Sequence, residues 1–360
     1  MSDLREARIA CRALREAAPD LPLFVSLTFE RKRRGFFTVM GDPLVPSLLE
    51  LARQGADAVA LARLVDGLPH YAAQSTALAP AEVPKAVADR YRLYLVLGNS
   101  RKPVITGTFV RDGFAPMQAM LAAVRGGEQQ LRDRPLAIFD CCPSPPLKWS
   151  DLTCQALIDC ARSGVPAELV SMPLTGATAP VTLREAVVQH AAENLSGVVI
   201  HQLASRGAPI VYGGSPSAFD MRRGTTPMGA IETMMIDSAY AQVGKHLGLP
   251  THAYMGLSDA KCPDYQAGLE SGIGAVLAAL SGINVVSGSG MLDFEMCQSL
   301  EKVLLDHDAL GMAHRLIRGI ERREGDALTL ISELVNRGTP FSPTTTPVAT
   351  GGTSSVSPRP

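Results

Sequence analysis

The chain has 360 residues, of which 46% are hydrophobic and 19% are charged, enough for one large barrel or two modest domains. A formal net charge of −1 gives no electrostatic reason to expect nucleic acid or a membrane surface as a partner. The N-terminus is charged and no apolar run is long enough for a membrane span, so we expect no signal peptide, no membrane helix and a cytoplasmic protein. The 7 cysteines include no CxxC pair, so neither a metal site nor a disulfide framework is expected.

Before residue 80, apolar runs alternate with helical periodicity. The spacing of Leu and Ala predicts a helix over 4–18, and a second helix is predicted over 45–53. Continuous apolar runs at 21–29 and 56–62 predict strands that are buried on both faces. With HYAAQSTAL (70–78) and the six later segments there are about nine candidate strands for the eight places of a closed barrel, and the surplus falls before residue 80.

From residue 80 onward, apolar runs alternate regularly with amphipathic segments. Strands are predicted over 102–109, 135–142, 167–174, 209–215, 251–258 and 284–290. Helices are predicted over 80–97, 115–125, 150–163, 181–205, 228–247, 266–281 and 294–322. Buried strands that alternate with helices favour a parallel sheet, so the predicted fold is α/β, a (β/α)8 TIM barrel.

The pattern divides the chain into three parts. Residues 1–63 form an N-terminal β/α segment and residues 64–335 form the main barrel. Residues 336–360 are rich in Thr, Ser, Pro and Gly and contain almost no large apolar residue. Such a composition predicts a disordered tail.

Polar residues follow two of the predicted strands, in the loops where parallel barrels place their chemistry. SDAK (258–261) brings Asp259 and Lys261 close enough to hold a bound carboxylate; the alternative is a helix N-cap followed by an exposed lysine. GGSPSAFDMRRG (213–224) lacks the spacings of nucleotide-binding loops. Asp220 can oppose a cation and Arg222 can grip a carboxylate; the alternative is a turn closed by an internal Asp–Arg pair.

Three further features allow a functional and a structural interpretation. FDCCPSPPLKW (139–149) contains adjacent cysteines, which rarely ligate one zinc, and aromatic rings that can face an ammonium group or pack in the core. LTGATAPVT (174–182) is a small-residue loop that leads into a helix, or a tight turn. His252 lies at a strand end, as a site residue or a core histidine. The absence of HExxH and GxSxG patterns argues against a metal hydrolase and a nucleophile elbow.

The chain from about residue 64 to about residue 335 resembles the trimethylamine methyltransferase family. This resemblance implies a (β/α)8 barrel that takes a methyl group from a methylated amine and passes it to the Co(I) of a corrinoid on a separate protein. The product then feeds methyl transfer to coenzyme M or tetrahydrofolate, and family members are often homo-oligomers. The segments that carry the resemblance are EVPKAVADRYRLYLVLGNSRKPVITGTF, DCCPSPPLKWSDLTCQALIDCA, LTGATAPVTL, IVYGGSPSAFDMRRGTTPMGA, GLSDAKCPDYQAGLE and GSGMLDFE.

The resemblance also suggests site residues. One branch of the family carries pyrrolysine and acts on trimethylamine; this chain has only standard residues, so it resembles the other branch, which uses quaternary amines such as glycine betaine. The expected catalytic residues are Asp220, Asp259 and Lys261. The expected substrate-binding residues are Tyr212, Phe219, Arg222, His252 and Tyr254. The small residues expected to face the corrinoid are Gly176, Gly213, Gly214, Ser215, Gly288 and Gly290.

The two ends of the chain depart from that family. Residues 1–60, with LPLFVSLTFE and GADAVALA, resemble part of a homocysteine S-methyltransferase barrel without its zinc-binding cysteines, and the tail replaces the family's C-terminal region. Two alternatives to an active methyltransferase therefore stay open. One is a barrel that binds a betaine or a corrinoid protein without turnover; the other is an aldolase-type or decarboxylase barrel that forms a Schiff base at Lys261.

Overall fold

The computed structural model describes residues 56–78, 80, 82–320 and 327–337. The segments predicted over 4–18, 21–29 and 45–53, and the tail after 337, lie outside the described residues. The chain divides into two compact units, Met1–Ile317 and Arg318–Pro360, and each is described by itself.

The first described element corrects a prediction. Residues 56–62, which we expected to form a strand, belong to helix α4 (Ala56–Gly67). Alanine has the highest helix propensity, and the buried Ala58, Leu61 and Val65 recur at helical spacing. The proposed domain boundary at residue 63 falls inside this helix.

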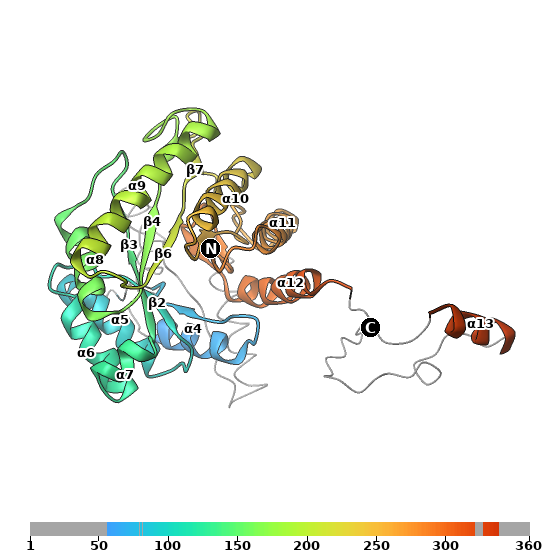
Figure 1. Cartoon of the computed structure of the whole chain (residues 1–360), viewed down its shortest axis with the longest axis horizontal. Coiled ribbons are helices and arrows are strands. Elements are labelled where there is room, and N and C mark those ends of the chain that lie inside the picture. Colours follow the sequence, from blue (N-terminus) through green and yellow to red (C-terminus); the bar gives the residue numbers. More distant parts are fainter. Residues whose placement is uncertain (1–55, 79, 81, 321–326, 338–360) are drawn as a thin grey trace, which may run out of the picture. The chain divides into compact units, whose positions relative to one another are not determined.

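The strands of the main sheet are parallel and lie side by side in chain order (Figure 1). A single bridge between Tyr212 and Thr251 connects the strand β6 to the strand β8. The sheet contains β1 (Gln74–Ser75), β2 (Val104–Thr106), β3 (Ala137–Cys141), β4 (Ala167–Ser171) and β6 (Ile210–Gly214), and β8 (His252–Tyr254) pairs with β9 (Val285–Ser287). The α/β fold with the strand order of a (β/α)8 barrel is confirmed; within the described residues no pairing of β9 with β1 is recorded.

Helices alternate with these strands and surround them (Figure 1). Ser150, Thr182 and Asp264 cap α8, α9 and α11 by accepting a hydrogen bond from a backbone N–H three residues later. The helices are η1 (Lys85–Val87, a 3-10 turn), α5 (Ala88–Leu97), α6 (Phe114–Arg125), α7 (Glu128–Asp133), α8 (Asp151–Ser163), α9 (Leu183–Ala204), α10 (Ile231–His246), α11 (Tyr265–Ser281) and α12 (Leu300–Arg318). None of the described helices is both long and apolar enough to cross a membrane.

The second unit contains one described helix, α13 (Ala327–Arg337). The tail predicted to begin at residue 336 therefore starts one residue before this helix ends.

Short extra strands lie in the loops that follow β4, β6 and β9. β5 (Leu174–Thr175) pairs with β7 (Ser217–Ala218) in parallel, and β10 (Met291–Leu292) forms an antiparallel hairpin with β11 (Cys297–Gln298). We call this end of the sheet, where the strands have their carboxyl ends, the carboxyl face. It carries all the loops that the sequence marked as candidates.

Candidate active site at the carboxyl ends of the strands

Strand alternation directs polar side chains to the inner side of the sheet. On β3, Phe139 packs against Phe114 of α6 with ring centroids 4.9 Å apart, so Asp140 points to the opposite, inner side. Glu168 of β4 and His252 of β8 meet each other across the sheet. We call Asp140, Glu168, His252, Tyr254 and Ser287 the inner cluster.

The deepest part of the inner cluster is a contact between Glu168 and His252. The Oε1 atom of Glu168 lies 2.7 Å from Nδ1 of His252, and both side chains are fully buried. On the other side of the ring, Nε2 lies 3.0 Å from Oγ of Ser287. Apart from this 2.7 Å contact, neither Glu168 oxygen has a hydrogen-bond partner among the described residues. The ring is thus held from both sides while one carboxylate oxygen stays available.

Asp140 adds a second carboxyl group that lacks a full set of partners. Its Oδ1 atom is buried and accepts no hydrogen bond from the described residues. Burial and then the neighbouring Glu168 raise the pKa of Asp140 well above its usual range, and Arg92 opposes that rise. A buried carboxyl group without partners is costly unless it binds a proton or a cation.

Arg92 of α5 supplies the nearest buried cation. Its guanidinium donates to the carbonyl oxygens of Thr76 at 2.8 Å and Gly107 at 2.7 Å, and it lies 4.0 Å over the ring of Phe109. These contacts tie the ends of β1 and β2 together. Two of the five N–H donors of Arg92 are therefore engaged with the backbone, and its charge acts on Asp140.

Tyr254 gives the inner cluster an aromatic wall. Its ring meets the ring of His252 edge-on, with centroids 4.9 Å apart. Burial and then the carboxyl groups of Asp140 and Glu168 raise the pKa of Tyr254, so its hydroxyl keeps its proton. An aromatic face beside carboxylates is an environment that favours an organic cation.

A hairpin with unusual backbone geometry lies beside the inner cluster. Asp293, Phe294 and Glu295 have φ values of 54°, 58° and 63°, in the left-handed region that non-glycine residues rarely adopt. Ser215 at the end of β6 donates to Glu295 at 3.4 Å. Asp237 of α10 is 1% exposed, and burial and then Glu295 raise its pKa. Strain of this kind persists when the surrounding structure enforces it, and it is common at functional sites.

Buried ionic contacts hold this hairpin in place. The backbone N–H of Gly290 donates to Asp306 at 2.6 Å, and Asp306 pairs with the buried Lys302 at 2.5 Å. At the tip, Lys261 forms an ion pair with Asp293 and lies 5.1 Å over the ring of Phe294. Lys261 is 67% exposed, so its side chain lies on the outer, solvent-facing side of the hairpin.

Asp259, another predicted catalytic residue, organises a loop. Its two carboxylate oxygens accept hydrogen bonds from the backbone N–H groups of Met228 and Gly229, both at 2.9 Å. Burial raises the pKa of Asp259 to about 7. The neighbouring Ser258 donates to Glu270 at 2.6 Å. Glu270 and Asp259 together connect the loop after β8 to the segment that leads into α10.

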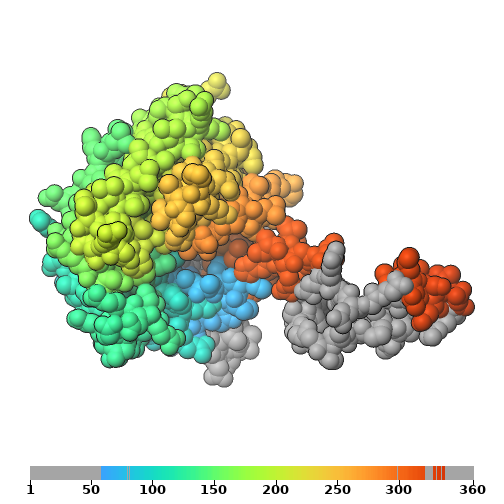
Figure 2. Space-filling model, in the orientation of Figure 1, coloured from blue at the N-terminus to red at the C-terminus, as the bar shows by residue number. Residues whose placement is uncertain are grey.

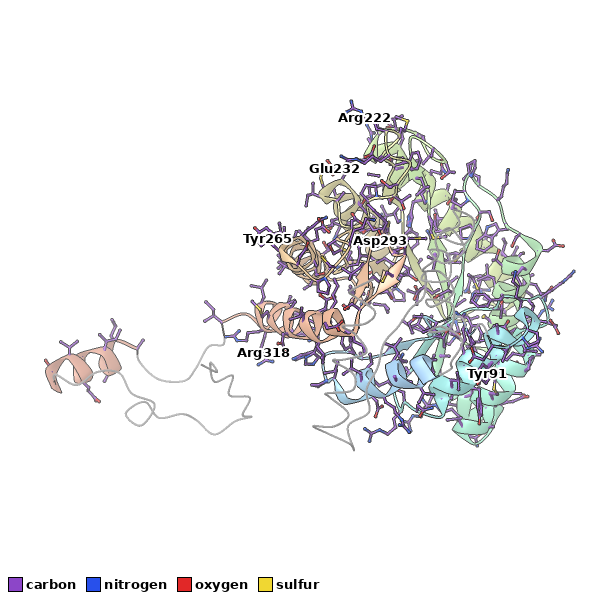
Figure 3. The ribbon with its side chains drawn as sticks, turned by 180° about the vertical axis from the view of Figure 1, so that it is seen from behind. Tyr91, Arg222, Glu232, Tyr265, Asp293 and Arg318 are labelled. Carbon is purple, nitrogen blue, oxygen red and sulfur yellow. The ribbon has the colours of Figure 1, made fainter. Side chains whose placement is uncertain are left out.

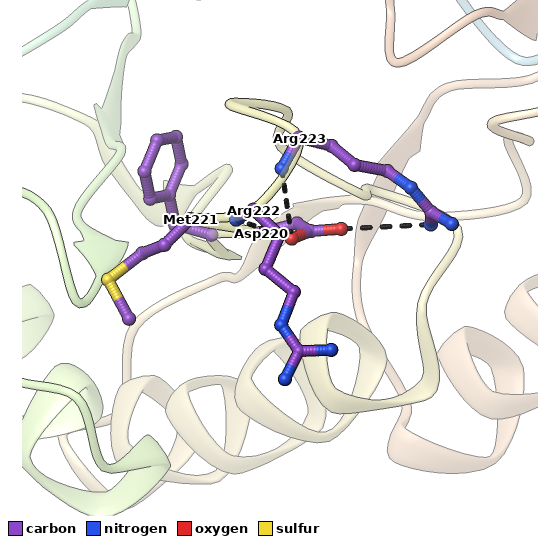
Figure 4. Close-up of a pocket in the computed structure, with 5 residues that line it drawn as sticks. Asp220, Met221, Arg222 and Arg223 are labelled. Atoms are coloured by element: carbon purple, nitrogen blue, oxygen red, sulfur yellow. Dashed lines mark hydrogen bonds and ion pairs between the residues drawn. The ribbon is translucent and has the colours of Figure 1, made fainter.

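Of the predicted substrate-binding residues, the structure brings His252 and Tyr254 together in the inner cluster. Tyr212 lies on the outer side of β6, where its hydroxyl is 3.4 Å from Nδ1 of His190 on α9. Phe219 and Arg222 belong to the loop after β7, in which Arg222 is exposed and Phe219 is half-buried. A pocket of about 420 Å³ in this loop is lined by Phe219, Asp220, Met221, Arg222 and Arg223 (Figure 4).

Asp220 closes the turn of that loop. It accepts hydrogen bonds from the backbone N–H groups of Arg222 at 2.9 Å and Arg223 at 3.3 Å, and the guanidinium of Arg223 lies 3.8 Å from its carboxylate (Figure 4). The internal Asp–Arg pair that the sequence allowed thus forms with Arg223. The side chain of Arg222 extends away from Asp220.

The small residues expected to face a corrinoid have different surroundings. A Cβ at Gly213 would lie 2.8 Å from the Cβ of His252, on the inner side, whereas a Cβ at Gly214 would lie 2.4 Å from Nε2 of His190, on the helix side. Ser215 is buried beside Glu295. Left-handed backbone requires glycine at the other three positions, which are Gly176, Gly288 and Gly290.

Sequence reasoning did not select Glu168, Ser287, Glu295, Asp237 or Arg92 as site residues. A signal for Glu168 exists, since it is the one charged residue in the otherwise apolar run AELVSMPL. Nothing local distinguishes the others, because their contacts join elements far apart in the chain. Among the described residues, no group of three or more His, Cys, Asp or Glu side chains is arranged to hold a metal ion.

Comparisons with known proteins agree with the resemblance of the motifs. The chain is 33% identical over 279 residues to the trimethylamine methyltransferase MttB of Desulfitobacterium hafniense, covering 78% of this chain and 56% of that protein. It is 40% identical over 195 residues to MttB of Methanosarcina barkeri, covering 54% of this chain and 39% of that protein. The glycine betaine methyltransferase of Desulfitobacterium hafniense is 28% identical over 263 residues, covering 73% and 55%.

The match is long on this chain and shorter on its relatives. The chain spans about half the length of the curated relatives it matches. A crystal structure of the monomethylamine methyltransferase of Methanosarcina barkeri aligns with a TM-score of 0.44 and 11% identity over 72% of this chain and 53% of that one. The family described as trimethylamine methyltransferase (MTTB) matches residues 24–346, which includes part of the segment that resembles a homocysteine S-methyltransferase. The chain belongs to the trimethylamine methyltransferase family.

Proposed function

We propose that this protein transfers a methyl group from a tertiary or quaternary methylated amine to the Co(I) of a corrinoid carried by a partner protein. The observation that carries the proposal is the pair of carboxyl groups of Asp140 and Glu168, in which Oδ1 of Asp140 and Oε2 of Glu168 are buried and have no hydrogen-bond partner among the described residues. Beside the ring of Tyr254 they form an environment that favours an ammonium ion. The family membership and the names of the relatives support the same reaction class.

The reaction requires no protein nucleophile. The electron pair of Co(I) forms the new bond to the methyl carbon, and the C–N bond breaks with its electrons on nitrogen. A quaternary ammonium leaves as a neutral amine, and a tertiary amine does so when its nitrogen carries a proton. The cationic form is the reactive one in both cases, so the protein's task is to hold it in line with the acceptor.

Each member of the inner cluster has a task in this proposal. Glu168 and Asp140 hold the cationic nitrogen, and Tyr254 provides an aromatic wall for its methyl groups. His252, fixed between Glu168 and Ser287, keeps the Glu168 carboxylate in position. The partner's corrinoid approaches from the carboxyl face. Co(I) needs a reducing environment, which supports a cytoplasmic location.

The test is methylation of free cob(I)alamin, followed by its absorbance change. Purified full-length protein is mixed with reduced cobalamin and, separately, with trimethylamine, glycine betaine, carnitine and tetramethylammonium. We expect methylation with at least one of them, and its loss in the Glu168→Gln and Asp140→Asn variants. Amine binding without methylation, by folded protein supplied with both free cobalamin and a corrinoid protein, would instead favour a binding barrel without turnover.

A further inference from the structure

Exposed apolar side chains from two loops meet at the carboxyl face. Val181, before α9, is 70% exposed, and Met221, after β7, is 68% exposed. A Cβ built on Gly176 would lie 3.8 Å from the sulfur of Met221 and 3.9 Å from a methyl group of Val181, so these side chains border one spot. We call Gly176, Val181, Met221, Arg222 and Arg223 the rim patch.

The rim patch is at an outer edge of the first unit. Arg222 is labelled at the top of Figure 3, far from the labelled Asp293 near the strands, and the segment around residue 220 protrudes at the upper edge of Figure 2. The loop follows β6 and β7 and therefore belongs to the same face as the inner cluster. It can touch a protein that approaches this face.

The rim patch carries excess positive charge. Its two arginines, Arg222 and Arg223, outnumber the one carboxylate of the same loop, that of Asp220, so the loop has a net charge of +1. That carboxylate already accepts two backbone N–H groups and pairs with Arg223. No ion pair is recorded for the guanidinium of Arg222 within the described part of the chain, and Figure 4 shows it extending away from Asp220. Arg222 is therefore available to a carboxylate from outside.

Exposed methionine beside exposed arginine is typical of a protein interface. Both residue types are enriched in interfaces, Met because its flexible side chain adapts to a partner and Arg because it binds carboxylates in a bidentate manner. A small ammonium substrate would be repelled by these arginines. The rim patch thus fits an acidic protein surface with an apolar centre better than it fits the amine.

We infer that the rim patch is the docking surface for an acidic face of the corrinoid-carrying partner protein, an inference that rests on the proposed function. The arginines attract the partner and set its orientation, and Met221 and Val181 pack against its apolar centre. The interaction weakens as salt increases, because it depends on exposed charges. Methyl transfer to free cobalamin does not depend on the rim patch.

The experiment compares Arg222→Glu with Arg206→Glu. Arg206 is an exposed arginine in the turn before β6, at the opposite end of the sheet, so both variants change the net charge by the same amount. Each protein is assayed with free cob(I)alamin and with a purified corrinoid protein that accepts methyl groups from a trimethylamine methyltransferase. The affinity for that corrinoid protein is also measured directly by biolayer interferometry, which requires no turnover.

We expect Arg222→Glu to weaken binding and to raise KM for the corrinoid protein by about 10-fold or more, with an unchanged rate on free cobalamin. Arg206→Glu should behave as wild type in all three measurements. Equal effects of the two variants, or wild-type affinity in Arg222→Glu, would overturn the docking surface. Failure of wild-type protein to methylate free cobalamin would count against the proposed reaction instead, because the interferometry still reports on docking.

Discussion

Replacing Gly213 by alanine tests whether the inner cluster needs its observed geometry. The added Cβ would lie 2.8 Å from the Cβ of His252, 3.0 Å from its Nδ1 and 3.1 Å from its carbonyl oxygen. Carbon atoms in ordinary contact are about 3.5–4.0 Å apart, so the methyl group is about 1 Å too close. The backbone of Gly213 is not left-handed and accepts alanine, which makes the steric clash the main effect.

The clash acts on the residue that positions Glu168. The ring of His252 contacts Glu168 at 2.7 Å on one side and Ser287 at 3.0 Å on the other. Moving the ring by about 1 Å disrupts both contacts. Overpacking of this kind costs about 1–3 kcal/mol of unfolding free energy. A misplacement of about 1 Å at a reacting centre also costs about 100-fold in rate. Gly213→Ala should therefore lose both stability and methyl transfer.

The assay combines urea unfolding with methylation of cob(I)alamin. The control is Gly272→Ala in α11, where an added Cβ meets nothing within 4 Å. The control should gain about 0.5–1 kcal/mol, since alanine is favoured over glycine within a helix, and should keep its activity. A Gly213→Ala protein as stable and as active as wild type would refute the reasoning about His252.

Further predictions concern charge and pH. Glu168→Gln and Asp140→Asn should each weaken substrate affinity by about 2–5 kcal/mol, measured by calorimetry with the amine that supports turnover, while the affinity for a neutral isostere stays the same. The pKa of Asp259 is about 7 when folded and lower when unfolded, so the folded state binds more protons between these values. The stability that the protonated Asp259 contributes is present at low pH and is lost as the pH rises towards 7. Asp259→Asn should therefore reduce the difference in unfolding free energy between pH 5 and pH 8, measured by urea unfolding. Lys302→Met leaves Asp306 buried without its cation and should cost about 3–5 kcal/mol in the same unfolding assay, whereas Lys302→Met combined with Asp306→Leu should recover most of that loss.

The alternation of strands and helices was predictable because it is local. Buried parallel strands read as short apolar runs, and the runs around β3, β4, β6, β8 and β9 lie at the predicted positions. Residues 56–62 were misassigned because an apolar run of that length is compatible with either element, and only α4's packing decides. The family was also predictable, since its motifs are contiguous in the chain.

The candidate site depended on tertiary structure. The sequence suggested His252 because it lies near a strand end and Tyr254 because the family resemblance implies an aromatic cradle, but Glu168 and Ser287 come from other strands that only the parallel sheet brings alongside. Arg222, for which the sequence suggested a role in substrate binding, lies in an exposed part of its loop, a fact that depends on the tertiary structure.

The amino-acid sequence by itself determined the alternation of the main strands and helices after residue 80, the parallel α/β class and the family, because periodicity and motifs are properties of neighbouring residues. Tertiary structure decided which polar side chains converge and which face solvent. The raised pKa of Asp140 depends on burial and on Glu168 of the neighbouring strand, and no local sequence pattern shows either of them.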